Sequence, residues 1–88
     1  EIIVEARNLD EVNEILNEGG VKRILLDNFD YETTKKAIEI IGNKCQTESS
    51  GGITETTISE YANCGVDYIS VGALTHSVQN FDLSLKAI

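Results

Sequence analysis

The chain alternates between two spacings of its apolar residues. Short apolar runs of the kind found in buried strands precede stretches in which apolar side chains recur every three or four residues, the spacing of an amphipathic helix. Strands are expected at 2–4, 23–27, 45–49 and 67–71. The helices between them would bury one apolar face each: Leu9, Val12, Ile15 and Leu16, then Tyr31, Ala37, Ile38 and Ile41, and then Ile58, Tyr61 and Ala62. The pattern therefore predicts a βα unit that repeats.

Polar residues and glycines mark the ends of these helices. Asn8, with Glu11 three residues later, is typical of a capping pair, and Asp30 and Thr54 stand where the second and third helices would begin. Glycines would end the three helices: Gly19 and Gly20, Gly42, and Gly65. The tail, residues 81–85, alternates apolar and polar positions and is expected to be a short final strand or a segment that covers a sheet edge.

The expected strand ends recur at a nearly constant interval. The steps from Glu5 to Asp27, Ser50 and Gly72 are 22, 23 and 22 residues. Strands joined by helices run parallel with right-handed crossovers, so these four positions are expected at the carboxyl end of one sheet, around one mouth. Ligands of α/β barrels bind at that end, and a phosphate site often lies in the loops after the last two strands.

Two glycine turns at that mouth are candidates for an anion site. Residues 48–54 read Glu-Ser-Ser-Gly-Gly-Ile-Thr, and such a Ser-Gly-Gly turn between a strand and a helix exposes several backbone amides together. Residues 70–76 form the second stretch, in which a strand ends at Gly72. Taken alone, a Gly-Gly pair after a strand is more often a simple turn, and acids at strand ends are often helix caps or solvated charges.

Composition narrows the class of protein. The chain has 88 residues, enough for one small domain, and a formal charge of −8, which disfavours nucleic acid and anionic membrane surfaces as partners. No apolar run approaches the roughly 20 residues of a membrane span. Cys45 and Cys64 lack CxxC spacing, so free thiols in a reducing, cytoplasmic compartment are expected. Because it opens on Glu1 inside an apolar run, we interpret the chain as a fragment or a processed chain.

Five blocks of the sequence, in order, resemble the carboxyl-terminal part of quinolinate phosphoribosyltransferase. They cover nearly the whole chain: residues 4–5, 24–28, 48–54, 65–77 and 82–86. The resemblance implies an α/β fold in which parallel βα units form the carboxyl-terminal part of an open α/β (TIM-like) barrel, with residues 1–88 as a single partial domain. It also implies the family's reaction, in which quinolinate and phosphoribosyl pyrophosphate give nicotinate mononucleotide, pyrophosphate and carbon dioxide in NAD biosynthesis, with magnesium.

The resemblance also assigns roles to residues. Glu5 and Asp27 match the acids beside the ribose hydroxyls and magnesium, a cation that commonly takes one or two carboxylates plus substrate oxygens and water. The turns that hold the 5′-phosphate match Ser50, Gly51, Gly52, Gly72 and Ala73, with His76 as either a phosphate contact or a surface or capping histidine. Two positions depart from the family: Ser49 where Ala is more frequent, and Ala6 where a bulkier apolar residue is usual.

Charge at the mouth limits what this segment can bind. Both substrates are polyanions, and Arg7 and His76 are the cations expected near the mouth, because Lys22, Arg23 and Lys44 begin strands and are expected at the opposite end. Glu48 would either reach the mouth or hold the Ser-Gly-Gly turn. The resemblance implies that the quinolinate site lies in earlier sequence, partly on a neighbouring subunit, so we expect a homo-oligomer, a dimer or higher. The 88 residues alone are expected to be inactive.

Two alternatives stay open at this point. The chain could belong to another phosphate-binding α/β-barrel enzyme, such as a synthase acting on a sugar phosphate, or it could be a noncatalytic half-barrel. Binding of nicotinate mononucleotide or the phosphoribosyl donor, without a response to indole or thiamine precursors, would favour the quinolinate enzyme over another phosphate-binding barrel. A steady-state activity assay tests the noncatalytic alternative.

Overall fold

A computed structural model describes residues 2–79. The tail segment 81–85, for which a short strand or an edge-covering segment is expected, lies outside these residues. The elements, in chain order, are β1 (Ile3–Ala6), α1 (Leu9–Glu18), β2 (Arg23–Asp27), α2 (Tyr31–Ile41), β3 (Gln46–Ser50), α3 (Ile58–Asn63), β4 (Tyr68–Val71) and β5 (Leu74–Ser77). The predicted repeat of βα units is therefore confirmed.

One five-stranded sheet organises the described chain, with the strands side by side in sequence order. Strands β1 to β4 are parallel, as predicted, whereas β5 pairs antiparallel with β4. The sequence did not predict this hairpin. Its two-residue turn, Gly72–Ala73, places Gly72 at a φ of +60°, a conformation that tight hairpin turns require and that glycine adopts without strain.

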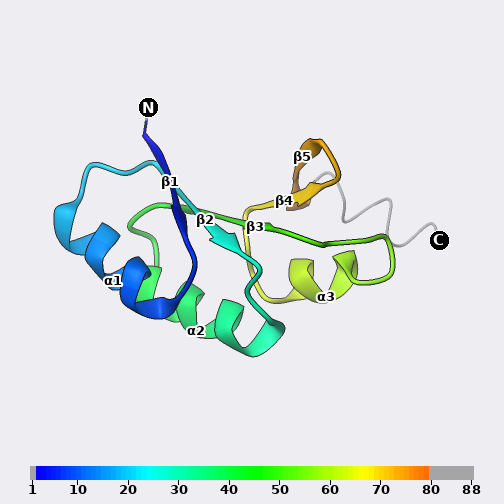
Figure 1. Ribbon diagram of the computed structural model, residues 1–88, viewed down its shortest axis with the longest axis horizontal. Coiled ribbons are helices and arrows are strands. Elements are labelled where there is room, and N and C mark those ends of the chain that lie inside the picture. Colours follow the sequence, from blue (N-terminus) through cyan, green and yellow to red (C-terminus); the bar gives the residue numbers. More distant parts are fainter. Residues whose placement is uncertain (1, 80–88) are drawn as a thin grey trace.

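The three helices of the described chain lie on one side of the sheet (Figure 1). Alternate strand residues point toward them, and the apolar faces of the helices meet these residues in a single core. The core members with no solvent exposure are Ala6, Val12, Ile24, Leu26, Ala37, Ile41 and Ile69. Burial of these side chains against one another is the main stabilising contribution to the fold.

The first two helix starts agree with the sequence. The Asn8 side chain accepts a hydrogen bond from the Glu11 amide at 2.9 Å, and the Asp30 side chain accepts one from the Thr33 amide at 2.8 Å. Hydrogen bonds from the side chain and the backbone amide of Thr33 lower the pKa of Asp30. Each cap satisfies an amide that the first turn of a helix leaves without an internal partner.

The predicted start of the third helix at Thr54 is wrong. Helix α3 begins at Ile58, after Thr57, because residues 54–57 form a separate turn. In that turn the Thr54 carbonyl accepts from the Thr57 amide at 3.1 Å, and the Thr57 hydroxyl accepts from the Thr54 amide at 3.0 Å. Threonine hydroxyls that bond to the local backbone compete with helix formation, which delays the helix here.

Both cysteines are free thiols, as the sequence predicts. Cys64 is buried and Cys45 is half-buried, and burial raises the pKa of each thiol. Within the described part of the chain, none of the helices is of a length and apolar character that would let it span a membrane.

Candidate functional site

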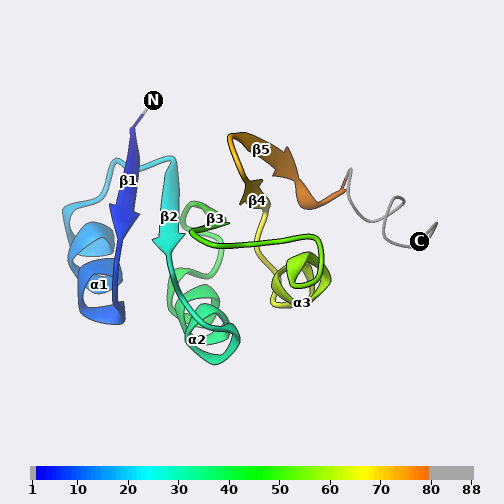
Figure 2. The same ribbon diagram turned by 45° about the vertical axis from the view of Figure 1, so that its right-hand side comes forward.

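The side of the sheet that no helix of the described chain covers carries polar side chains. These alternate along the strands with the buried core residues, so they share one face. We call this set the polar face: Glu5, Arg23, Asp27, Gln46, Glu48, Ser50, Tyr68 and Ser70. The hairpin of β4 and β5 continues the sheet above α3 (Figure 2).

The two predicted acids lie on the polar face of neighbouring strands but at different levels. Glu5 is opposite Leu25, and Asp27 is opposite Ser50. Asp27 is therefore two residues, or roughly 6.6 Å, farther toward the carboxyl end than Glu5. The equal sequence intervals had suggested one level for all the strand ends, whereas the strand pairing brings the acids to one face in a staggered arrangement.

The environment of Glu5 is exposed. Its carboxylate lies 3.5 Å from the Arg7 guanidinium, and both side chains are largely open to solvent. An exposed ion pair of this kind contributes little to stability. Both groups thus remain accessible to a ligand at this end of the sheet.

The Ser-Gly-Gly turn stands directly beside the end of β2. The Ser50 carbonyl accepts a hydrogen bond from the Asn28 amide at 2.9 Å. A Cβ atom on Gly51, whose φ is +89°, would lie 2.5 Å from Asn28 Oδ1 and 3.0 Å from Asn28 N, so this position has no room for a side chain. The turn predicted to hold a phosphate is therefore fixed next to Asp27.

Asn28 is a residue whose role sequence reasoning missed. It has a φ of +58°, the left-handed region that asparagine tolerates better than most side chains. Its position directly after an acid at a strand end was the available signal. In the structure it connects the end of β2 to the turn after β3.

The second predicted turn, Gly72–Ala73, is exposed at the tip of the hairpin. A side-chain atom added at Gly72 would meet nothing within 4 Å. The pairing of β3 with β4 ends at Ser49 and Ile69, so Ser50 and Ser70 each directly follow the last paired residue of their strand. Both glycine turns thus follow the carboxyl ends of neighbouring parallel strands, as the spacing predicted.

His76 lies on the other side of the sheet from the acids. It pairs with Ile69, whose side chain is buried under the helices, and directly opposite residues of an antiparallel pair point to the same face. Thr75, in contrast, pairs with Ser70 and points to the same side of the sheet as the polar face, with its hydroxyl 3.1 Å from that of Ser70. The structure therefore does not bring His76 to the polar face.

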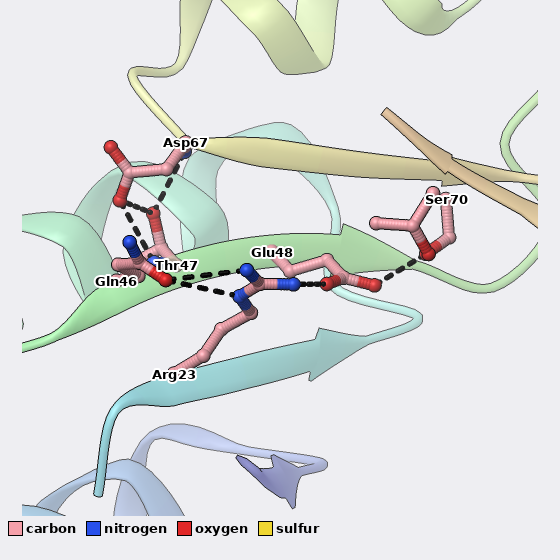
Figure 3. A network of polar contacts seen from close by, with 7 residues as sticks. Arg23, Gln46, Thr47, Glu48, Asp67 and Ser70 are labelled. Carbon is pink, nitrogen blue, oxygen red and sulfur yellow. Dashed lines mark hydrogen bonds and ion pairs between the residues drawn. The ribbon is translucent and has the colours of Figure 1, made fainter. Parts of the chain in front are cut away.

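A connected polar network occupies the middle of the polar face (Figure 3). Arg23 Nη1 donates to Glu48 Oε1 at 2.9 Å, and Ser70 Oγ donates to Glu48 Oε2. The guanidinium also donates to Gln46 Oε1 at 3.3 Å from two nitrogens and lies 3.6 Å from the centre of the Tyr68 ring. Both charged side chains are shielded, since that of Arg23 is 17% exposed and that of Glu48 is 5% exposed.

This network corrects one expectation. Arg23 was predicted to lie at the end of the sheet opposite the mouth, because it begins β2. Its backbone does lie there, but the long side chain extends along the sheet to Glu48, two residues farther on. The positive charge of Arg23 is consequently on the polar face, and Glu48 points into that face.

The residues present fit magnesium in the mode that uses few protein ligands. Between residues 2 and 79, no group of three or more histidine, cysteine, aspartate or glutamate side chains could hold a metal ion together. Glu5 and Asp27 supply two hard oxygen donors on one face. This donor set suits a cation that keeps several waters and binds mainly through substrate oxygens.

A cavity of about 520 Å³ lies at the opposite end of the sheet. Its lining includes Lys22, Lys44, Cys45 and Asp67. Ligands of parallel α/β folds bind at the carboxyl ends of the strands. We therefore place the candidate site not at this cavity but at the carboxyl end of the polar face, where Asp27 and Ser50 lie.

Comparison with known proteins gives the family of the chain. Residues 1–86 match the family model described as the quinolinate phosphoribosyl transferase C-terminal domain. The chain is 46% identical to a probable nicotinate-nucleotide pyrophosphorylase (carboxylating) of Methanocaldococcus jannaschii, over 99% of this chain and 33% of the relative. It is 41% identical to the chloroplastic nicotinate-nucleotide pyrophosphorylase (carboxylating) of Oryza sativa, over 94% of this chain and 26% of the relative.

Solved structures show the same relationship. The nicotinate-nucleotide pyrophosphorylase of Francisella tularensis superposes with a TM-score of 0.75 at 36% identity, covering 85% of this chain and 28% of that one. The chain thus spans about a quarter to a third of the length of the curated relatives it matches. The predicted fold class, part of an α/β barrel, is confirmed, and the chain belongs to the quinolinate phosphoribosyltransferase family, within its carboxyl-terminal domain.

Proposed function

We propose that this chain supplies the donor-binding side of a quinolinate phosphoribosyltransferase. In that reaction a phosphoribosyl group passes from phosphoribosyl pyrophosphate to quinolinate, and decarboxylation gives nicotinate mononucleotide. One observation carries the proposal: in a chain of this family, two acids and two glycine turns lie at the carboxyl ends of adjacent parallel strands. The Ser-Gly-Gly turn is held beside one of those acids.

The proposed roles follow from the chemistry of each group. Backbone amides and the Ser50 hydroxyl hold the 5′-phosphate at the two turns, which comprise Ser50, Gly51, Gly52, Gly72 and Ala73. Amides that converge at turns bind phosphate without a positive side chain. Glu5 and Asp27 accept hydrogen bonds from the ribose hydroxyls and supply carboxylates to magnesium, which, when bound, neutralises the pyrophosphate leaving group. His76, which lies on the other side of the sheet, is not part of the proposed phosphate site.

The step itself requires positioning more than proton transfer. The quinolinate ring nitrogen attacks the anomeric carbon as the bond to pyrophosphate breaks, through an oxocarbenium-like transition state. Fixing the phosphate at one end of the donor and the ribose hydroxyls in the middle orients the anomeric carbon for this attack. The nearby carboxylates stabilise the positive charge that develops on the sugar.

The rest of the assembly forms part of the same proposal. The polar face carries few cations, so the basic residues that bind quinolinate are proposed to come from outside these 88 residues, in part from a second subunit of a homo-oligomer. We propose a cytoplasmic location on the basis of the free thiols.

Paired glycine substitutions test the phosphate site in a full-length enzyme that contains this chain. Gly72→Ala and Gly20→Ala both add a methyl group in open space at a positive φ, but Gly20 lies before β2, away from the proposed site. Both should lose similar stability, whereas Gly72→Ala alone should weaken nicotinate mononucleotide binding, by about tenfold or roughly 1.4 kcal/mol. Equal affinities of the two variants by calorimetry would contradict the assignment.

The 88-residue chain alone tests the proposal that the quinolinate-binding residues lie outside it. Its polar face carries Glu5 and Asp27 toward substrates that are strongly anionic, whereas the charge of Glu48 is paired with that of Arg23. Each nearby like charge opposes binding by about 1 kcal/mol even in water. We expect no nicotinate mononucleotide from the isolated chain with quinolinate, the donor and magnesium. Turnover above background would show that the chain holds a complete site.

A further inference from the structure

We infer that Arg23, Glu48 and Ser70 are positioning residues that fix the two glycine turns relative to each other. The inference rests on the proposed function, because its consequence is measured as donor binding. It concerns side chains to which no contact with substrate has been assigned. Their role would be to hold in place the backbone that makes those contacts.

Backbone pairing by itself does not fix the two turns. Strands β2 and β3 pair over five residues, but β3 and β4 pair only at Glu48–Tyr68 and Ser49–Ile69. The ladder stops one residue before the Ser-Gly-Gly turn begins at Ser50. At this level, where the site would form, the connection from β3 to β4 is made by the hydrogen bond from Ser70 Oγ to Glu48 Oε2.

Ser70 also connects to the far side of the hairpin. Its hydroxyl lies 3.1 Å from that of Thr75, and these two residues pair with each other on either side of the Gly72–Ala73 turn. Through Ser70, Glu48 is therefore connected to both strands that carry that turn. Glu48 itself is two residues before Ser50, so one carboxylate joins the bases of both turns.

Arg23 allows the Glu48 carboxylate to be buried in its charged form. The Glu48 side chain is 5% exposed, and a buried carboxylate is strongly destabilising unless it is paired and hydrogen-bonded. Arg23 provides the pairing charge, and Gln46 and the Tyr68 ring hold the guanidinium in one orientation. The pair also leaves no net charge at the centre of the polar face, where an anionic donor would approach.

The test uses a full-length enzyme that contains this chain, with Ser70→Ala as the main variant. Ser70→Thr keeps the hydroxyl and serves as the rescue, and Ser59→Ala makes the same truncation on α3, away from the polar face. The readouts are kcat, the KM values for the phosphoribosyl donor and for quinolinate, the affinity for nicotinate mononucleotide by calorimetry, and the thermal midpoint.

We expect Ser70→Ala to raise the donor KM and weaken nicotinate mononucleotide binding by about tenfold, with the quinolinate KM changed by less than about twofold. Ser70→Thr and Ser59→Ala should stay close to wild type. A double-mutant cycle then tests the connection: Glu48→Gln combined with Ser70→Ala should lose no more donor affinity than the larger single change, because both break one link.

Three results would overturn the inference while the wild-type enzyme is active. These are an unchanged donor KM in Ser70→Ala, an equal rise in both KM values, and additive losses in the double variant. A wild-type enzyme that makes no nicotinate mononucleotide would instead remove the proposed function, and the inference with it. The wild-type assay therefore distinguishes the two failures.

Discussion

The two faces of the sheet are built from the same strands yet differ in the polarity of their side chains and in what covers them. On the helix-covered face, Ile24, Leu26 and Ile69 have no solvent exposure and pack against helices. On the polar face, Arg23, Gln46, Glu48 and Ser70 form a connected network of hydrogen bonds (Figure 3). One face therefore stabilises the fold, and the other is available for chemistry.

Two adjacent serines show how sharp this division is. Ser49 is 1% exposed, and its hydroxyl has no hydrogen-bond partner among the described residues, whereas Ser50 lies on the polar face at the start of the proposed phosphate turn. A hydroxyl without a partner lowers stability on the helix-covered face, whereas on the polar face it can bind a ligand. A shift of one position along a strand decides which of the two it is.

The largest loss of stability is expected at Gly51, in the Ser-Gly-Gly turn that follows β3. Gly51→Ala would place a Cβ against Asn28 at a positive φ, so we expect a loss of stability above the roughly 1–3 kcal/mol of backbone strain alone. Gly52→Ala also adds a methyl group at a positive φ, but in open space, so its loss of stability should come from backbone strain alone. Urea unfolding of both variants measures the difference, and equal losses would show that the contact with Asn28 is unimportant.

Asp27→Asn should separate chemistry from stability on the polar face. The change preserves shape but removes the charge proposed to face the ribose and magnesium, so turnover of a full-length enzyme should fall by about tenfold, or roughly 1.4 kcal/mol of barrier. The magnesium requirement should rise, and Glu5→Gln should act in the same direction. Glu39→Gln, an exposed acid on α2, is the control. Wild-type kinetics across a magnesium titration would contradict the role of these acids.

The serine pair gives opposite results on the two faces. Ser49→Ala removes a buried hydroxyl without a described partner, so the free energy of unfolding should rise by about 1 kcal/mol while donor affinity is retained. Ser50→Ala should weaken donor binding and leave unfolding nearly unchanged. If Ser49→Ala instead destabilised the chain, its hydroxyl would have a partner in solution and the contrast between the faces would be weaker.

The smallest effect concerns the cap of α2. Hydrogen bonds from Thr33 lower the pKa of Asp30 in the folded chain, so its carboxylate stabilises the fold fully above the unfolded value of 3.8 and this contribution is lost as pH falls through the lower folded value. Asp30→Asn keeps a capping side chain without the charge. The difference in urea midpoint between wild type and this variant should shrink as the solution is made more acidic, and a constant difference would contradict the assignment.

The sequence by itself determined the βα repeat, the core and the first two helix caps. Short apolar runs indicate buried strands, and an apolar residue every three or four positions indicates the buried side of a helix. Asn8 and Asp30 cap their helices by hydrogen bonds to amides three residues away. Such local signals do not depend on the rest of the fold. The delayed start of α3 shows the limit, since three threonines within residues 54–57 offered the backbone more than one local arrangement.

Tertiary structure decided the levels of the strands and the contacts across them. Equal intervals between strand ends do not reveal that Glu5 lies two residues short of Asp27, because strand pairing depends on how the sheet packs. The position of the Arg23 charge beside Glu48, and the link from Glu48 to Ser70, join residues 25 and 22 positions apart in sequence. The long Arg23 side chain places its charge well away from its own backbone, so the position of that charge could not be predicted from the position of the residue in its strand.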